Sequence, residues 1–145
     1  STGDFSHVAA VHHETTTGRL NDVARLAELS ETHGARLLLD TVSSFGAEHI
    51  PFHSPALVAC AATANKCLHG VPGVAVVLVR RTALIERASG ASSLYLDLFR
   101  NYQAQQDGYP AFTPAVQAMY GLHTALQELD ERSDVYSLGL VIFEW

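Results

Sequence analysis

The chain has 145 residues, of which 48% are hydrophobic and 17% charged, a composition that excludes a disordered chain and predicts one packed domain. A formal net charge of −6 argues against nucleic acid as a partner. No apolar run approaches the roughly 20 residues that span a bilayer, and the first residues lack the basic and apolar regions of a signal peptide. We therefore expect a cytoplasmic protein that binds neither nucleic acid nor membranes.

Residues 7–40 follow a strand–helix–strand pattern. Short apolar runs predict buried strands at His7–Val11 and Arg36–Asp40. Between them, apolar residues at helical spacing predict a helix over 21–33, with Asn21 as its N-cap and Gly34 where it stops. Such a unit predicts parallel neighbouring strands joined by a right-handed crossover.

The pattern continues less regularly toward the C-terminus. The remaining elements are strands predicted at 57–62 and 74–79 and helices predicted at 82–88 and 114–131. The long helix is expected to have Thr113 as its cap and Pro114 at its first position. The segment 92–106 fits neither pattern. Together these elements predict an α/β domain with a mostly parallel sheet.

Polar residues follow three of the predicted strands, at 12–18, 40–44 and 63–66. In an open parallel sheet, ligands bind beyond the carboxyl ends of the strands. Asp40 directly ends a Leu-Leu-Leu strand, where a carboxylate is costly to bury unless it faces a positive charge. A protonated pyridine ring would supply that charge, and the aspartate would keep its nitrogen protonated.

Lys66 is the only lysine among nine basic residues, the other eight being arginines. Arginine cannot form an imine and lysine can, so side-chain imine chemistry has one possible site in this sequence. Each residue also has a plain structural interpretation, in which Asp40 caps the following turn and Lys66 is a solvated loop residue. Together the two residues favour a catalytic interpretation over the structural one, because both follow neighbouring predicted strands and would meet at one crevice.

The run His12-His13-Glu14 is the one that suggests metal ligands. Adjacent residues of an extended segment point to opposite sides, and no third ligand has a matching spacing. Cys60 and Cys67 have no metal-site spacing either and predict no disulfide framework. We therefore expect no metal site.

Three segments, in this order, resemble one family: His-His-Glu-Thr-Thr-Thr-Gly at 12–18, Asp-Thr-Val-Ser-Ser-Phe-Gly at 40–46, and Ala-Asn-Lys-Cys-Leu-His-Gly-Val-Pro-Gly at 64–73. They look like the fold-type-I pyridoxal-phosphate aminotransferases, in particular the 2-aminoethylphosphonate–pyruvate type. The resemblance implies that residues 1–131 are part of the large domain of that fold, a three-layer α/β structure with a mostly parallel sheet.

The resemblance also implies roles for individual residues around the cofactor. Lys66 would bind pyridoxal phosphate as an internal aldimine and later shuttle a proton, and Asp40 would bind the pyridinium nitrogen. Val42 would pack against one face of the ring. Thr15 would lie near the 3-hydroxyl of the ring.

Two further residues would contact the cofactor's phosphate. Asn65 would help to hold it, and Thr113 would reach the phosphate bound by the neighbouring subunit of a homodimer. The implied reaction transfers the amino group of 2-aminoethylphosphonate to the cofactor and then to pyruvate, giving phosphonoacetaldehyde and alanine. An alanine–glyoxylate or serine–pyruvate type of aminotransferase, or a non-catalytic α/β module, is the alternative.

The resemblance has two limits. Family members have a glycine-rich phosphate loop and a small domain with a carboxylate-binding arginine, and this sequence contains neither. Because such a loop supplies backbone N–H groups to the phosphate, we expect the 145-residue chain alone to be inactive or nearly so. Residues 132–145 form an apolar tail that resembles a protein-kinase segment, but the sequence lacks the kinase nucleotide motifs and predicts no kinase activity.

Overall fold

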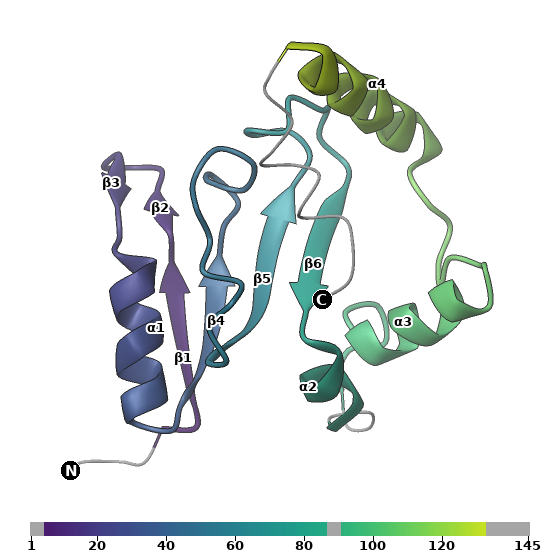
Figure 1. Cartoon of the computed structure of the whole chain (residues 1–145). Helices are drawn as coiled ribbons and strands as arrows, with labels where there is room; N and C mark the ends of the chain where they lie inside the picture. The colour runs from purple at the N-terminus through teal and green to yellow at the C-terminus, as the bar shows by residue number, and fades with distance from the viewer. Residues whose placement is uncertain (1–4, 87–90, 133–145) are drawn as a thin grey trace.

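The computed structural model describes residues 5–86 and 91–132 (Figure 1). Apart from its first residue, the tail expected at 132–145 lies outside the described residues. Four strands form one sheet in the order β1 (His7–Val11), β4 (Arg36–Asp40), β5 (Leu57–Thr63) and β6 (Ala75–Val79). The first three are parallel, and β6 is antiparallel to β5 at one edge. The expected α/β class with a mostly parallel sheet is confirmed.

The direction of β6 follows from its connection. Residues 64–74 join β5 to β6 without a helix, and a crossover between parallel strands needs about a dozen residues or more. The chain therefore turns back instead of crossing over. The Ala64 N–H donates to the Val74 carbonyl at 3.0 Å and closes the base of this loop.

Helix α1 (Val23–Thr32) connects the small hairpin after β1 to β4 (Figure 1) and packs against β4. Its N-cap is Asp22, whose carboxylate accepts a hydrogen bond from a first-turn N–H at 2.9 Å, so the expectation of Asn21 was wrong. The Asn21 side chain instead donates to the carbonyl of Val11, at the end of β1. The helix stops where expected, because Gly34 has φ +63°, a conformation that favours glycine.

The polar segment after β1 forms a hairpin as well as a turn. Strand β2 (His13–Glu14) pairs antiparallel with β3 (Arg19–Leu20). Gly18, at φ +68°, donates its N–H to the carbonyl of Glu14 at 2.8 Å. The hairpin extends β1 beyond the edge of the sheet (Figure 1) and places Thr15 in its turn.

In the described ranges, three helices follow β6: α2 (Arg81–Glu86), α3 (Leu98–Gln106) and α4 (Val116–Arg132). Residues 87–88 of the helix expected at 82–88 lie outside the described residues. Helix α3 has no buried residue, which explains why its sequence shows no clear apolar stripe. Helix α4 begins at Val116, so Thr113 and Pro114 precede it, and neither takes its expected place as cap or first helical residue. None of the helices in the described ranges is long and apolar enough to span a membrane.

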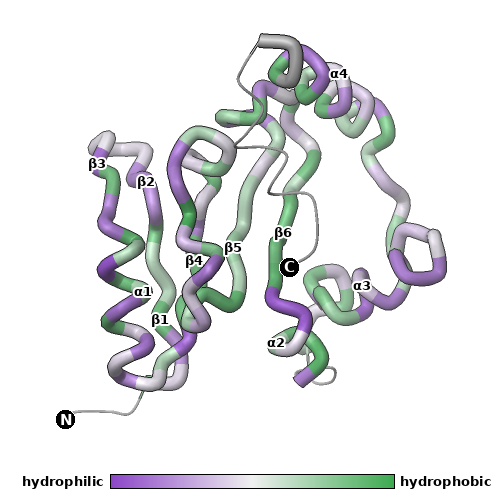
Figure 2. Tube along the Cα trace, in the orientation of Figure 1, coloured by the Kyte–Doolittle hydropathy of each residue, from purple (hydrophilic) through white to green (hydrophobic). Residues whose placement is uncertain are grey.

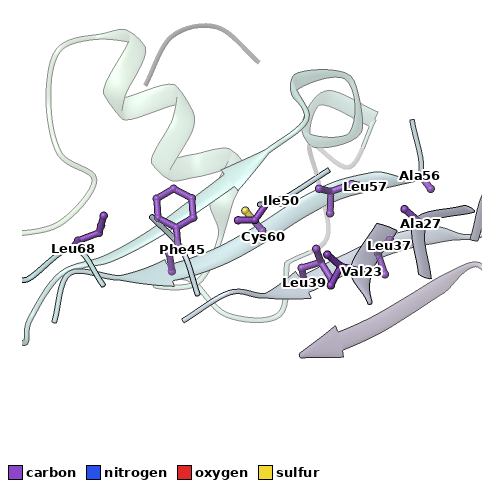
Figure 3. Close-up of a cluster of buried hydrophobic side chains, with 11 residues drawn as sticks. Val23, Ala27, Leu37, Leu39, Phe45, Ile50, Ala56, Leu57, Cys60 and Leu68 are labelled. Atoms are coloured by element: carbon purple, nitrogen blue, oxygen red, sulfur yellow. The ribbon is translucent and has the colours of Figure 1, made fainter. Parts of the chain in front are cut away.

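One face of the sheet is packed against helix α1 and the loops that follow β4 and β5. Figure 3 shows the side chains of this cluster, which includes Val23, Ala27, Leu37, Leu39, Phe45, Ile50, Ala56, Leu57, Cys60 and Leu68. Leu122 and Leu126 of α4 pack against it. The cluster therefore holds the carboxyl ends of β4 and β5 and the start of their loops in fixed positions.

The opposite face of the sheet is left uncovered by the described residues. Paired residues of neighbouring strands have side chains on the same face, so Ala9, Leu38 and Ala59 form one row there. Leu38 is 37% exposed, whereas its neighbour Leu39, on the packed face, is 3% exposed. Val77 of the hydrophobic strand β6 (Figure 2) lies on the uncovered face and is 41% exposed.

Candidate active site

The polar segments that follow β1, β4 and β5 lie at one edge of the sheet. The three strands are parallel, so their carboxyl ends meet there, as expected from the sequence. The backbone N–H of His12 donates to the Asp40 carbonyl at 2.8 Å, and the N–H of Thr41 donates to the Ala61 carbonyl at 2.9 Å. These bonds continue the pairing to the last residue of each strand and fix where each loop begins.

Asp40 ends β4 with its side chain on the uncovered face. It is paired with Val11 on one side and Ala61 on the other, and its side chain is exposed. Its Oδ1 atom accepts the N–H of Val42 at 2.9 Å, which holds the carboxylate at the edge of the sheet. The turn-capping interpretation of Asp40 is therefore correct for one oxygen. That bond leaves the second oxygen available to a ligand.

Lys66 lies in the loop between β5 and β6, with an exposed side chain. The backbone on either side of it is fixed, because the Gly70 N–H donates to the Ala64 carbonyl at 2.8 Å and the His69 N–H donates to the Lys66 carbonyl at 3.0 Å. His69 has φ +57°, which is uncommon for a residue with a Cβ atom. The amine is thus an exposed group on a loop whose backbone is fixed by hydrogen bonds.

Helix α4 packs closely on the loop that carries Lys66. A Cβ atom added at Gly70 would lie 3.3 Å from Leu122 Cδ1, and one added at Gly73 would lie 3.1 Å from the Ala118 Cβ. These glycines permit the approach, and α4 lies over the carboxyl end of β5 (Figure 1). The glycines in this segment therefore serve helix–loop packing.

The turn after β4 contacts both neighbouring segments through Ser43. Its hydroxyl lies 2.7 Å from the hydroxyl of Thr15, and its carbonyl accepts a hydrogen bond from His13 Nδ1 at 3.1 Å. The same carbonyl accepts from Cys67 Sγ at 3.5 Å. In the sequence, Ser43 stands out only as part of the segment at 40–46 that resembles the family. Its partners are far away in the chain, and no local pattern identifies them.

His12 lies in the run that suggests metal ligands, but the sequence does not predict its burial. It is 3% exposed, and its Nδ1 atom has no hydrogen-bond partner in the part of the chain that the structure describes. Burial lowers the pKa of His12 below its ordinary value; Glu48 opposes this effect, and the nearby His13 and His49 add to it. No group of three or more His, Cys, Asp or Glu residues among those described is arranged to hold a metal ion.

The remaining predicted site residues are placed as follows. Val42 is half-buried beside Asp40, and Asn65 is exposed next to Lys66. The Asn65 Oδ1 atom accepts the Thr63 hydroxyl at 2.8 Å, so its Nδ2 group is left as a donor. Thr113 is exposed in the loop before α4, and no hydrogen bond in the described ranges joins it to the other site residues.

The arrangement fits an aromatic cofactor that carries a ring nitrogen and a carbonyl carbon. The Asp40 carboxylate and the Lys66 amine are both exposed at the same edge of the sheet. The ion pairs of the described ranges are Arg25–Glu28 and Arg36–Glu86, so neither group is neutralised by an ion pair there. An amine is free for covalent attachment, and a carboxylate is free to pair with a protonated ring nitrogen.

Comparison with known proteins gives consistent relatives. A family model described as aminotransferase class-V matches residues 2–136. A 2-aminoethylphosphonate–pyruvate transaminase of Pseudomonas fluorescens is 39% identical over 129 residues, which are 88% of this chain and 35% of that protein. One from Aeromonas hydrophila is 40% identical over 134 residues, 91% of this chain and 35% of that protein. The chain therefore spans about a third of the length of these relatives.

Solved structures share the fold over the same length. An aspartate aminotransferase of subgroup IV from Thermus thermophilus has a TM-score of 0.77 at 29% identity, covering 88% of this chain and 36% of that one. An alanine–glyoxylate aminotransferase from Nostoc sp. has a TM-score of 0.74 at 26% identity, covering 88% and 35%. These similarities confirm the fold expected from the sequence.

Proposed function

The chain belongs to the class-V aminotransferase family, and from this premise we propose that it is the lysine-bearing part of a pyridoxal-phosphate-dependent transaminase. The supporting observation is the position of two exposed charged groups at the same edge of the sheet. The Asp40 carboxylate ends β4, and the Lys66 amine lies in the loop that follows β5, its parallel neighbour. Members of this family transfer an amino group between an amine and a 2-oxo acid. The activity proposed is that of the longer proteins, since the chain spans about 35% of its relatives.

The described residues would hold the cofactor at three points. Asp40 would pair with the ring nitrogen through the carboxylate oxygen that the Val42 N–H leaves available. The Val42 side chain, half-buried beside it, would pack on one ring face. Thr15, held by its contact with the turn after β4, would lie near the 3-hydroxyl.

The phosphate would be contacted by two residues that lie apart in the chain. The Nδ2 group of Asn65 would donate to a phosphate oxygen, because Oδ1 is bound to Thr63. Thr113 would reach the phosphate of a partner subunit in a homodimer, which agrees with its exposure and its lack of contacts with the other site residues in the described ranges.

When bound, the pyridoxal ring acts as an electron sink for a carbanion at the substrate carbon. The chain's own residues would do the rest. The carboxylate of Asp40 would keep the ring nitrogen protonated, which the electron sink requires. The amine of Lys66 would hold the cofactor covalently and, when free, would serve as the general base and general acid that carries a proton.

The proposed amino donor is 2-aminoethylphosphonate and the acceptor is pyruvate. The donor loses its amino group and becomes phosphonoacetaldehyde, and pyruvate gains that group and becomes alanine. The support is the name of the relatives at 39% and 40% identity. A donor of the alanine–glyoxylate type is the alternative, supported by the Nostoc structure at 26% identity.

Covalent attachment tests the proposal directly. The chain is incubated with pyridoxal phosphate, reduced with borohydride and digested, and the labelled peptide is identified by mass spectrometry. We expect the label on Lys66, the only lysine, and its loss in Lys66→Arg, which keeps the charge but forms no imine. Labelling confined to the N-terminal amine, or none at all, would contradict the proposal and favour a non-catalytic module.

The amino donor is tested with the longer relatives, because the 145-residue chain alone is expected to be inactive or nearly so. 2-Aminoethylphosphonate, alanine and serine are added separately, and the absorbance of the bound cofactor is followed. We expect the change to be fastest with 2-aminoethylphosphonate. A faster change with alanine would support the alternative donor and leave the assignment of Lys66 intact.

A further inference from the structure

Ser43 links the three segments that carry the candidate site residues. Its hydroxyl is 2.7 Å from the hydroxyl of Thr15, and its carbonyl accepts a hydrogen bond from Cys67 Sγ at 3.5 Å. Cys67 directly follows Lys66, and Ser43 lies in the turn that Asp40 begins. One residue is thus in contact with the loop of the amine, the turn of the carboxylate and the hairpin of the threonine.

The carbonyl of Ser43 has its full complement of partners. It accepts His13 Nδ1 at 3.1 Å in addition to Cys67 Sγ, and a carbonyl oxygen has two lone pairs. A donor to a carbonyl must carry a hydrogen, so this contact requires the His13 tautomer that has a hydrogen on Nδ1. The turn is therefore connected to the hairpin through His13 as well as Thr15.

The backbone bonds of the sheet do not make this connection. The bonds from His12 to Asp40 and from Thr41 to Ala61 join the strand ends, before the loops diverge. Beyond those points, Ser43 makes the side-chain bonds that join the Asp40 turn to its neighbours in the described ranges. It is bonded to His13 and Thr15 of the hairpin and to Cys67 of the Lys66 loop. Further along, the loop after β4 is bonded through Ser54 to Glu31 of α1 and to Arg80, neither of which is a candidate site residue.

We propose that Ser43 is a positioning residue of the candidate site, whose hydroxyl orients Thr15 and whose carbonyl holds the loop of Lys66 against the Asp40 turn. Either hydroxyl can be the donor in this contact. The proposal requires that Ser43 donates, which leaves the Thr15 hydrogen free to donate to an oxygen on the cofactor ring. The orientation of Thr15 toward the cofactor rests on the proposed function. The mechanical link between the segments does not.

The reactivity of the Cys67 thiol reports on the link without any cofactor. Cys67 is half-buried, whereas Cys60 is 2% exposed and burial raises its pKa to about 11, so Cys67 is the thiol that an alkylating reagent attacks near pH 8. If the link holds, removing the Thr15 hydroxyl loosens Ser43 and with it the Cys67 contact. Thr15 itself has no hydrogen bond to Cys67 in the described ranges.

We expect Ser43→Ala and Thr15→Val each to raise the alkylation rate about fivefold, the factor that one net hydrogen bond provides. The double variant should be no faster than either single one, because both remove the same bond. Ser43→Thr, which keeps a hydroxyl, should alkylate at the rate of the unchanged chain. Thr17→Val, in the same turn, and Ser92→Ala, both at exposed positions, are the matched controls and should change nothing.

The proposal is overturned if Thr15→Val leaves the rate unchanged, or if the two effects multiply in the double variant. Thr15 is exposed, so its variant keeps the test valid even where Ser43→Ala does not fold. Pyridoxal phosphate affinity is measured on the same variants. If the unchanged chain does not bind pyridoxal phosphate, the proposed function is contradicted but the role of Ser43 is not. The alkylation rates still test whether Ser43 links the segments.

Discussion

His12 couples stability to pH through its burial. The side chain is 3% exposed, and burial lowers its pKa from the ordinary value of 6.5, so the unfolded chain takes up a proton first as the pH falls. The stability that neutral His12 provides is present above pH 6.5 and is lost as the pH falls below it. We expect the free energy of unfolding, measured by urea denaturation, to fall as the pH decreases from 7.5 to 5.5. The fall should be smaller in His12→Gln than in the unchanged chain.

The exposed His53 gives the control, because His53→Gln removes an imidazole that is not buried. Its unfolding should show the same pH dependence as the unchanged chain. Glu48 favours the charged form of His12 and acts against the effect, so Glu48→Gln should steepen the pH dependence. Equal slopes for His12→Gln and the unchanged chain would show that His12 is not the coupled group.

At the residue scale, the sequence indicates the chemistry better than it indicates the geometry. Lys66 and Asp40 are predictable because one is the only lysine and the other ends an apolar strand. The role of Ser43 is not predictable, since its partners lie 28 and 24 positions away in the chain. A hydroxyl is compatible with many contacts, and only the folded chain selects among them.

At the element scale, strands are predicted well and connections poorly. The strand at Arg36–Asp40 is found at its predicted bounds, because buried apolar runs leave few alternatives. The N-cap was misplaced by one residue, since Asn21 and Asp22 both suit that position and Asn21 is engaged by Val11. Helix α3 was not recognised, because it buries no residue and therefore has no periodic apolar stripe.

Gly70 is enclosed by Ala64 of its own loop as well as by α4, and this gives a prediction at this scale. A Cβ atom at Gly70 would lie 3.0 Å from the backbone oxygen of Ala64 and 3.1 Å from its Cβ. Backbone cannot move aside easily, so we expect Gly70→Ala to destabilise the chain by about 1–3 kcal/mol. Thermal unfolding followed by circular dichroism measures the change.

Gly121→Ala is the informative comparison, because it tests the same helix–loop contact with a different neighbour. Its added Cβ would lie 3.0 Å from Val71 Cγ2, a side-chain methyl on an exposed residue that can shift. Alanine also favours the helix over glycine by about 1 kcal/mol. The change in stability should therefore be smaller than for Gly70→Ala, and the reverse order would contradict the close backbone contact.

At the scale of the whole molecule, the two faces of the sheet differ in what covers them. Leu39 packs in the buried cluster, whereas Leu38 on the other face is 37% exposed, next to Ala9 and Ala59. An apolar sheet face left this open favours self-association. The composition could not reveal this, because both faces are built from the same apolar residue types.

Adjacent leucines in β4 provide a matched pair that tests the asymmetry. Leu39→Ala leaves a cavity in the packed cluster and should lower the free energy of unfolding by about 2–5 kcal/mol. Leu38→Ala removes the same atoms from a partly exposed position and should cost about 1 kcal/mol or less. Both are measured by urea denaturation at low protein concentration, where self-association is least. Equal costs would mean that the face of Leu38 is covered in solution, and a concentration dependence of the Leu38→Ala cost alone would identify a second copy of the chain as the cover.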